Sequence, residues 1–179
     1  MRIIRGSHQG RKIIAPNNLP VRPTTDYAKE GLFNIINNYF HFDAISVLDL
    51  FSGTGNISYE FAARGAREVV AVEINPSCTD FINKTAQMLS FEKLSVMKLD
   101  VASFLDRTRQ QFNIIFADPP YECQEYNTIV NLVFDRNLLL PNGFLIIEHS
   151  RHENFQAHPK FYQQRIYGKV NFSIFAENI

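Results

Sequence analysis

The stretch Val47-Leu48-Asp49-Leu50-Phe51-Ser52-Gly53-Thr54-Gly55-Asn56-Ile57 decides the fold of this chain. It begins with an apolar run that carries one acid, and such a run predicts a buried parallel strand. Two glycines then form a loop of small residues, and residues 57–64 predict a helix. Glycine lets backbone approach a ligand closely, and the N–H groups of a helix N-terminus favour negative charge. The stretch therefore predicts an adenosine cofactor site, although an ordinary strand-to-helix turn has the same pattern.

Strands and helices are predicted to alternate from residue 44 onward. The strands are expected near residues 45–50, 68–73, 94–99, 113–117 and 143–148, and the helices near 56–64, 76–89, 101–110 and 124–136. Phe161–Tyr167 and Val170–Ala176 flank Gly168-Lys169 and predict a terminal antiparallel hairpin. We therefore expect an α/β fold with a seven-stranded, mostly parallel sheet and helices on both faces. Right-handed crossovers place its ligand crevice at the carboxyl ends of the strands.

The N-terminal segment has a different pattern. Residues 2–5 and 11–14 are short β-like runs around a loop with glycine at both ends, which predicts a hairpin, and a linker with two prolines follows. Thr25 or Asp26 is expected to cap a helix. One face of that helix collects the apolar residues Ala28, Leu32, Ile35, Ile36 and Tyr39. We expect a basic hairpin and linker over residues 1–22 and one main domain over residues 23–179.

Composition and charge limit the classes of protein that remain. The chain has 179 residues, 45% of them hydrophobic and 20% charged, which is typical of one globular domain. No apolar run is long enough to span a membrane, the Arg-rich start is not a signal peptide, and two cysteines indicate a reducing cytoplasm. His149 and His152 lie close in sequence but lack a third ligand, so we expect no metal.

Net charge is zero over the whole chain but not over its start. Residues 1–30 hold six Lys and Arg against two Asp and Glu, a local net charge of +4. A basic arm on a neutral body predicts an anionic partner, with solubilising charge as the simpler alternative.

Acids recur at four predicted strand ends. They are Asp49, Glu73, Asp100 and Asp118. Glu73 lies twenty residues after Gly53, where an acid can accept hydrogen bonds from ribose hydroxyls. Asp100 could accept a hydrogen bond from an adenine amine. To this point a nicotinamide dehydrogenase and a methyltransferase fit about equally, although the loop lacks the third glycine of the dinucleotide fingerprint.

The segment Asp118-Pro119-Pro120-Tyr121 separates these two classes. An aromatic exocyclic amine is a poor nucleophile because its lone pair is delocalised into the ring. The Asp118 carboxylate and the Pro119 carbonyl could accept its two N–H groups and turn the lone pair toward an electrophilic methyl group. The prolines stiffen the loop, and Tyr121 could stack on the base. A rigid turn after a strand is the alternative without function.

These residues carry a resemblance that covers nearly the whole chain. Asp49–Gly55, Glu73, Asp100 and Asp118–Tyr121 resemble class I S-adenosylmethionine-dependent methyltransferases that modify amino groups. Residues 2–6, 10–12, 22–26 and 30–34 further resemble the bacterial 16S rRNA guanine-N2 methyltransferases that act on guanine 966. Family members usually carry Arg-Val-Arg-Glu where this chain has Tyr27-Ala28-Lys29-Glu30, so one charge that faces RNA is missing.

The resemblance implies an activity, a cofactor and a set of site residues. The implied activity is methyl transfer from S-adenosylmethionine to the N2 amine of one guanine, by a cytoplasmic and monomeric enzyme acting on 16S rRNA, within a 30S subunit or an assembly intermediate. The expected catalytic residues are Asp118, Pro119, Pro120 and Tyr121. The expected cofactor-binding residues are Asp49, Phe51, Gly53, Gly55, Glu73, Asp100, Val101 and Thr25. The expected RNA-binding residues are Arg2, Arg5, Arg11, Lys12 and Arg22.

Three other classes stay open at this stage. A DNA adenine-N6 methyltransferase uses a similar four-residue motif but normally needs a target-reading domain, for which the chain has little room. A protein glutamine methyltransferase would prefer Asn in place of Asp118. A non-catalytic nucleotide-binding module is the third. Cys123 lacks the preceding proline typical of cysteine-dependent ring methylation, and we expect it to be a bystander.

Overall fold

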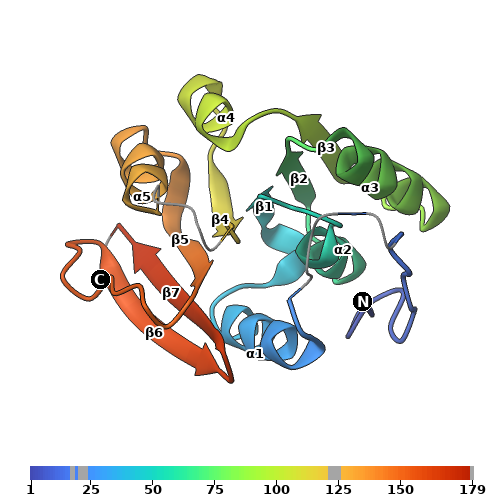
Figure 1. The fold of residues 1–179 in the computed structure, drawn as a ribbon, viewed down its shortest axis with the longest axis horizontal. Coiled ribbons are helices and arrows are strands. Elements are labelled where there is room, and N and C mark those ends of the chain that lie inside the picture. Colours follow the sequence, from blue (N-terminus) through green and yellow to red (C-terminus); the bar gives the residue numbers. More distant parts are fainter. Residues whose placement is uncertain (17–18, 20–23, 121–125, 178–179) are drawn as a thin grey trace.

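One seven-stranded sheet organises the computed structural model, which describes residues 1–16, 19, 24–120 and 126–177. The strands lie in the order β3-β2-β1-β4-β5-β7-β6 (Figure 1). The parallel strands are β1 (Ser46–Leu50), β2 (Glu68–Glu73), β3 (Leu94–Lys98), β4 (Phe112–Ala117) and β5 (Leu139–His149). β7 (Val170–Ala176) is antiparallel to both β5 and β6 (Phe161–Tyr167). The predicted mostly parallel sheet and terminal hairpin are confirmed.

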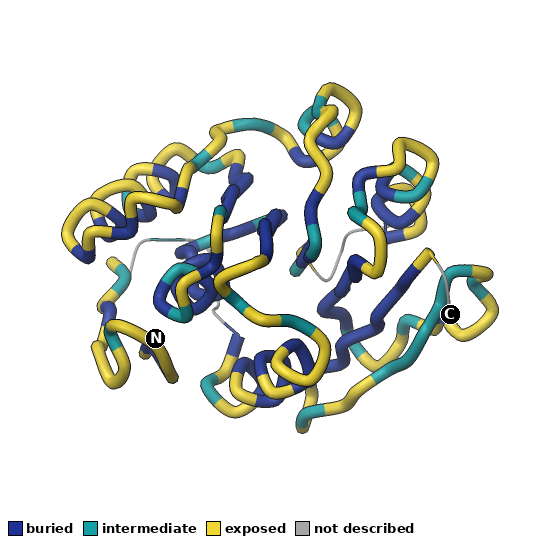
Figure 2. The backbone as a smooth tube through the Cα atoms, turned by 180° about the vertical axis from the view of Figure 1, so that it is seen from behind, coloured by how far each residue is buried: buried dark blue, intermediate teal, exposed yellow. Residues whose placement is uncertain are grey.

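Helices cover both faces of this sheet, as predicted. On one face lie α1 (Asp26–Asn37), α2 (Asn56–Ala63) and α3 (Pro76–Met88), and on the other α4 (Val101–Arg107) and α5 (Tyr126–Asp135). Alternate strand residues explain the two layers, since Val47 packs with the first set and Leu48 with the second. Figure 2 shows the buried stretches gathered in the strands, with exposed stretches on the outer sides of the helices. None of the helices in the described ranges is both long and apolar enough to cross a bilayer.

Some predicted boundaries were wrong. The helix expected over residues 101–110 ends at Arg107, and the strand expected from residue 143 begins at Leu139. Tyr39 was placed on the buried face of the first helix, but α1 ends at Asn37 and Tyr39 is 47% exposed. Two consecutive asparagines, poor residues for a helix interior, end α1 before it reaches Tyr39. A short 3₁₀ helix, Phe42–Ala44, then leads into β1.

The N-terminal segment folds back on itself as a short antiparallel pair. Ile3 and Ile13 donate their N–H groups to the Arg11 and Met1 carbonyls, each at 3.0 Å, although neither side extends into a full β-strand. The one bridge of this segment pairs Arg2 with Lys12, and Ile3 and Ile13 are buried in the same core as α1 and α2. Ile4 and Arg5 donate their N–H groups to the Glu60 carboxylate on α2, at 2.8 and 3.0 Å, instead of to a facing strand. We call residues 1–14 the N-terminal arm.

A close backbone contact fixes the turn of the arm against α2. Gly6 has a φ of +93°, and a Cβ added there would lie 2.0 Å from the Ala63 carbonyl oxygen. The next residue, Ser7, donates its N–H to that same oxygen at 2.8 Å. Only glycine allows this approach, which explains the glycine at the start of the arm's loop.

Candidate active site

The candidate site lies where the strand order changes direction, between β1 and β4. In an open α/β sheet this switch point leaves a crevice at the carboxyl ends of the strands. Asp49 and Glu73 lie at the carboxyl ends of β1 and β2, and Asp118 directly follows β4. Asp100 follows β3, and a fifth acid, Glu148, lies at the end of β5. The topology therefore brings the predicted strand-end acids to one edge, and it adds Glu148 to them.

The loop after β1 adopts the backbone that its sequence predicts. Phe51, Gly53 and Gly55 have φ values of +57°, +52° and +80°, and the two glycines take this region without cost. Both glycine N–H groups are used inside the protein, Gly55 donating to the Ser52 carbonyl at 2.7 Å and Gly53 to Glu73 Oε2 at 2.8 Å. The glycines therefore shape the loop. Gly55, the N-cap residue of α2, has no side chain to cap the helix, and the N–H groups of Asn56 and Ile57 have no partner in the described part of the chain.

Asp49 orders the start of α2. It is 1% exposed and accepts hydrogen bonds from the backbone N–H and the hydroxyl of Ser58. Burial raises the pKa of Asp49 to about 7 against these hydrogen bonds, and the charge of Glu73 adds to the increase. A carboxyl group that is about half protonated at pH 7 and bonded to its own loop is a structural support for the crevice.

Glu73 and Asp100 occupy the two strand ends beyond β1. Glu73 is buried, with Oε1 accepting the Asn75 N–H at 2.8 Å and Oε2 accepting from Gly53. Asp100 is exposed, and its Oδ2 caps α4 by accepting the Ser103 N–H at 2.9 Å. Val101 next to it packs its side chain into the core beneath α4. Both acids keep lone pairs for a ligand's hydroxyl or amine.

Asp118 opens the motif that follows β4. It is half-buried, Pro119 is buried and Pro120 is exposed. Burial raises the pKa of Asp118 well above its usual range, with further contributions from the negative charges of Glu148 and Asp49. Tyr121 and Cys123 lie outside the described residues.

Glu148 is a site residue that the sequence did not single out. It is 3% exposed and accepts a hydrogen bond from the Thr24 hydroxyl at 2.8 Å. Burial raises the pKa of Glu148 to about 7, although the Thr24 hydrogen bond opposes this increase. Like the other site acids it follows an apolar run at a strand end, which is the signal that could have identified it.

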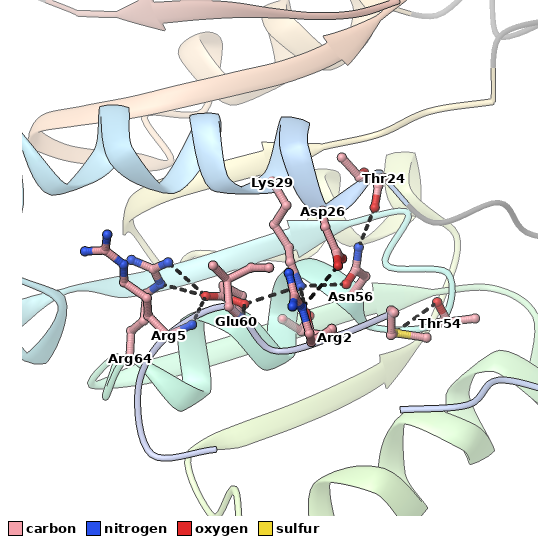
Figure 3. A network of polar contacts seen from close by, with 12 residues as sticks. Arg2, Arg5, Thr24, Asp26, Lys29, Thr54, Asn56, Glu60 and Arg64 are labelled. Carbon is pink, nitrogen blue, oxygen red and sulfur yellow. Dashed lines mark hydrogen bonds and ion pairs between the residues drawn. The ribbon is translucent and has the colours of Figure 1, made fainter. Parts of the chain in front are cut away.

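A buried polar network joins this edge to the N-terminal arm (Figure 3). Asn56 donates its side-chain N–H to the Thr24 carbonyl at 3.0 Å and accepts from Lys29 Nζ at 2.9 Å. Lys29 is 1% exposed, donates to the Arg2 carbonyl at 2.6 Å and pairs with Glu60 at 3.3 Å. Burial lowers the pKa of Lys29 more than the attraction of Glu60 raises it. The network ties the arm, α1 and α2 together behind Glu148.

The position of Lys29 in the sequence indicates this buried network. The charge count over residues 1–30 treated Lys29 only as a surface charge. Lys29 lies three and seven positions before the buried residues Leu32 and Ile36, so it shares their helix face. A charged residue on an apolar face predicts a buried partner. The same helix carries Thr25 as its N-cap, with the hydroxyl accepting the Ala28 N–H at 3.3 Å, as predicted.

The basic residues of the arm face solvent. Arg2, Arg5, Arg11 and Lys12 are exposed, and Arg2 forms an ion pair with Asp26 at 3.3 Å. Arg22 lies outside the described residues. Tyr27, where relatives carry an arginine according to the resemblance, is 68% exposed and packs edge-to-face on Tyr167 with ring centroids 5.8 Å apart.

A separate hollow and the distribution of metal-binding side chains also help to define the site. A hollow of about 430 Å³ lies elsewhere, between the arm and the turn before β3, and includes Ser7, His8, Phe91 and Lys93. It holds none of the strand-end acids. Within the described ranges, no group of three or more His, Cys, Asp or Glu is placed to hold a metal ion.

The strand order, with an antiparallel seventh strand inserted beside β5, is that of the class I methyltransferase fold. The structure resembles that of yhhF from Escherichia coli with a TM-score of 0.85 and 26% identity, covering 98% of this chain and 96% of that one. The chain belongs to the conserved hypothetical protein 95 family, whose model matches residues 1–176.

Two relatives carry a more specific name. The ribosomal RNA small subunit methyltransferase D of Haemophilus influenzae is 32% identical, over 83% of this chain and 78% of that protein. The protein of the same name from Escherichia coli strain K12 is 27% identical, over 98% of this chain and 89% of that protein.

Proposed function

We propose that this protein transfers a methyl group from S-adenosylmethionine to the N2 amine of a guanine in 16S rRNA, guanine 966. The observation that carries the proposal is the placement of Asp118 and Pro119 across the switch point from the glycine loop after β1. The relatives named as small-subunit rRNA methyltransferases support the RNA substrate. We expect a cytoplasmic monomer that meets this guanine within a 30S subunit or an assembly intermediate.

The residues at the edge of β1, β2 and β3 fit the cofactor. Gly53 and Gly55 keep side chains out of the loop. The N–H groups of Asn56 and Ile57, which have no partner among the described residues, suit the methionine carboxylate. Glu73 would accept from the ribose hydroxyls and Asp100 from the adenine amine. Phe51, Val101 and Thr25 would complete the surroundings of the cofactor, which supplies an electrophilic methyl group when bound.

Asp118 and Pro119 would position the guanine amine. The Asp118 carboxylate and the Pro119 carbonyl accept the two N2–H groups, so the nitrogen lone pair is directed out of the ring plane. Pro119 and Pro120 offer no N–H donors that would compete for these acceptors. Tyr121 would stack on the base. Orientation of this kind can lower a barrier by roughly 7–11 kcal/mol in well-aligned systems.

The target guanine must leave any base-paired stack to reach these residues. Exposed charges on the arm and Arg22 would hold the flanking phosphates. Because the arm buries Ile3 and Ile13, deleting it would damage the core as well as the RNA contact. Substitution of its exposed charges is therefore the sharper test.

The double variant Arg11→Ala/Lys12→Ala is expected to weaken RNA binding and to leave cofactor affinity unchanged. Each lost phosphate contact should reduce the slope of log K against log salt by about 1. Titration of RNA at several salt concentrations measures this slope. The exposed pair Arg107 and Arg109, near the end of α4, offers a matched control for net charge. If the Arg107→Ala/Arg109→Ala control reduces the salt slope as much as Arg11→Ala/Lys12→Ala does, the arm is not part of the RNA interface.

Activity should depend on pH through the carboxyl groups of the site. An ionised Asp118 accepts an N–H group more strongly than a neutral one, and burial, Glu148 and Asp49 raise its pKa. Glu148 faces it with a pKa of about 7. Groups with raised pKa values lose their protons only as the pH rises through those values. We therefore expect kcat/KM to increase from pH 6 to pH 8.5, measured with saturating cofactor. A profile flat over this range would contradict a contribution of the ionised carboxylate to turnover.

Labelled cofactor and undermethylated 30S particles test the proposed function. Transfer of label to 16S rRNA is expected. Label found in DNA adenine would favour a DNA methyltransferase, and cofactor binding without transfer to any nucleic acid would favour a non-catalytic module.

A further inference from the structure

Glu148 lies beside Asp118 at the carboxyl ends of the neighbouring strands β5 and β4. β4 and β5 are parallel neighbours in which Ala117 is aligned with Ile147, so the residues that follow each of these are neighbours too. The two carboxyl groups are close enough for the charge of Glu148 to raise the pKa of Asp118. The site therefore presents two adjacent acids to any ligand that Asp118 contacts.

One oxygen of Glu148 is held in place and the other is not. Thr24 donates its hydroxyl to Oε2, and Asn56, itself fixed by Lys29, holds the Thr24 carbonyl. Oε1 has no hydrogen-bond donor among the residues that the structure describes. Glu148 as a whole is 3% exposed, yet Oε1 is not among the fully buried side-chain atoms that lack a partner, so this oxygen remains accessible to a ligand. With Oε2 held by Thr24 and Oε1 without a donor in the described part of the chain, the Glu148 carboxylate can accept a hydrogen bond from a ligand.

Guanine offers two neighbouring donors on one edge, the N1–H and the N2 amine. Adenine and 2-aminopurine instead carry a lone pair at N1. A carboxylate that faces N1 therefore attracts guanine and repels the other two bases. Sites built to bind an N–H or O–H group can reject an analogue that lacks it by roughly 10⁴–10⁵-fold.

We propose that Glu148 selects guanine by accepting its N1–H through Oε1, while Asp118 accepts from the N2 amine next to it. This inference rests on the proposed function, and it assigns base selection to a residue outside the Asp118–Tyr121 motif. Thr24, Asn56 and Lys29 hold Glu148 in the orientation that this contact needs.

A Glu148→Gln variant and a 2-aminopurine substrate test the inference together. The Thr24 hydroxyl orients the glutamine oxygen toward itself, which turns the amide NH₂ toward N1 of the base. That group donates to 2-aminopurine but opposes the N1–H of guanine. Wild-type enzyme should prefer guanine by about 10²-fold or more in kcat/KM, and the variant should reduce this ratio at least tenfold.

The substrates are 30S particles reconstituted with 16S rRNA that carries either guanine or 2-aminopurine at the target position. Both bases have the 2-amino group, so the same product bond forms on each. Glu92→Gln, an exposed acid in the turn before β3, is the matched control and should keep the wild-type ratio. Cofactor affinity, measured by calorimetry, should be equal in all three proteins.

A failure of the role assigned to Glu148 and a failure of the proposed function give different results. Equal loss on both substrates in Glu148→Gln would make Glu148 a structural residue and overturn the inference. A wild-type ratio near one would overturn it as well, even if the variant fails to fold. Absence of methyl transfer by the wild-type enzyme to guanine N2 would instead reject the proposed function.

Discussion

Replacing Asp118 with alanine is expected to lower kcat for methyl transfer by about 10²–10³-fold, the usual cost of removing one positioned polar group from an active site. Affinity for S-adenosylmethionine should change by no more than a few-fold. The reason is placement: Asp118 follows β4, whereas the loop and acids assigned to the cofactor follow β1, β2 and β3. Single-turnover kinetics and calorimetry measure the two quantities separately.

Asp118→Asn is the matched control for this effect. Asparagine keeps one acceptor oxygen of similar size, so its loss of kcat should be smaller than that of alanine. Parallel loss of turnover and of cofactor affinity in the alanine variant would mean that Asp118 belongs to the cofactor site, and the assigned role would be wrong.

Replacing Glu60 with alanine is expected to lower the free energy of unfolding by about 3–5 kcal/mol. The Glu60 side chain is fully buried, pairs with Lys29 and Arg64, and accepts the N–H groups of Ile4 and Arg5. Its loss leaves a buried lysine without its carboxylate and removes the acceptor of the Ile4 and Arg5 N–H groups. Urea unfolding measures the stability, and exchange of the Ile4 and Arg5 amide protons reports the arm.

Asp106 provides a contrasting pair for this prediction. It bonds Arg136 at 3.2 Å with 69% of its side chain exposed. Asp106→Ala should therefore cost no more than about 1 kcal/mol. If the Glu60 and Asp106 variants lose the same stability, the network behind the site is not what holds the arm.

Features carried by local sequence were predicted well. The apolar run to Leu50, the glycine loop and the acids after each strand lie within single βα units, so spacing alone locates them. Thr25 as a helix cap follows from the residues beside it. The terminal hairpin has the same local origin, since Gly168, with a φ of +64°, marks its turn.

Features that depend on distant contacts were not predicted. Thr24 and Glu148 are 124 residues apart in sequence but share a hydrogen bond. The pairing within the arm is short, and the N–H groups of Ile4 and Arg5 donate to Glu60, 56 and 55 residues away. Lys29 entered the charge count as part of a basic surface, yet it is buried and neutralised by that same Glu60. A local pattern contains no information about such partners.

The partners of the Gly53 and Gly55 N–H groups were also not evident from the sequence. Sequence alone suggested that Gly53 and Gly55 hold the ligand through their backbone, but their N–H groups are bonded to Glu73 and Ser52. Their contribution is the positive φ that keeps the loop open in front of α2. The N–H groups without a partner in the described part of the chain lie one and two residues after Gly55, at Asn56 and Ile57.

The central claim is the identity of the methylated atom, and one measurement addresses it. Undermethylated 30S particles are incubated with the protein and labelled S-adenosylmethionine, the 16S rRNA is digested, and its nucleosides are separated by mass. The account predicts label in N2-methylguanosine alone, from a fragment that contains guanine 966. Label in N6-methyladenosine, in another position of guanine, or in ribosomal protein would contradict it.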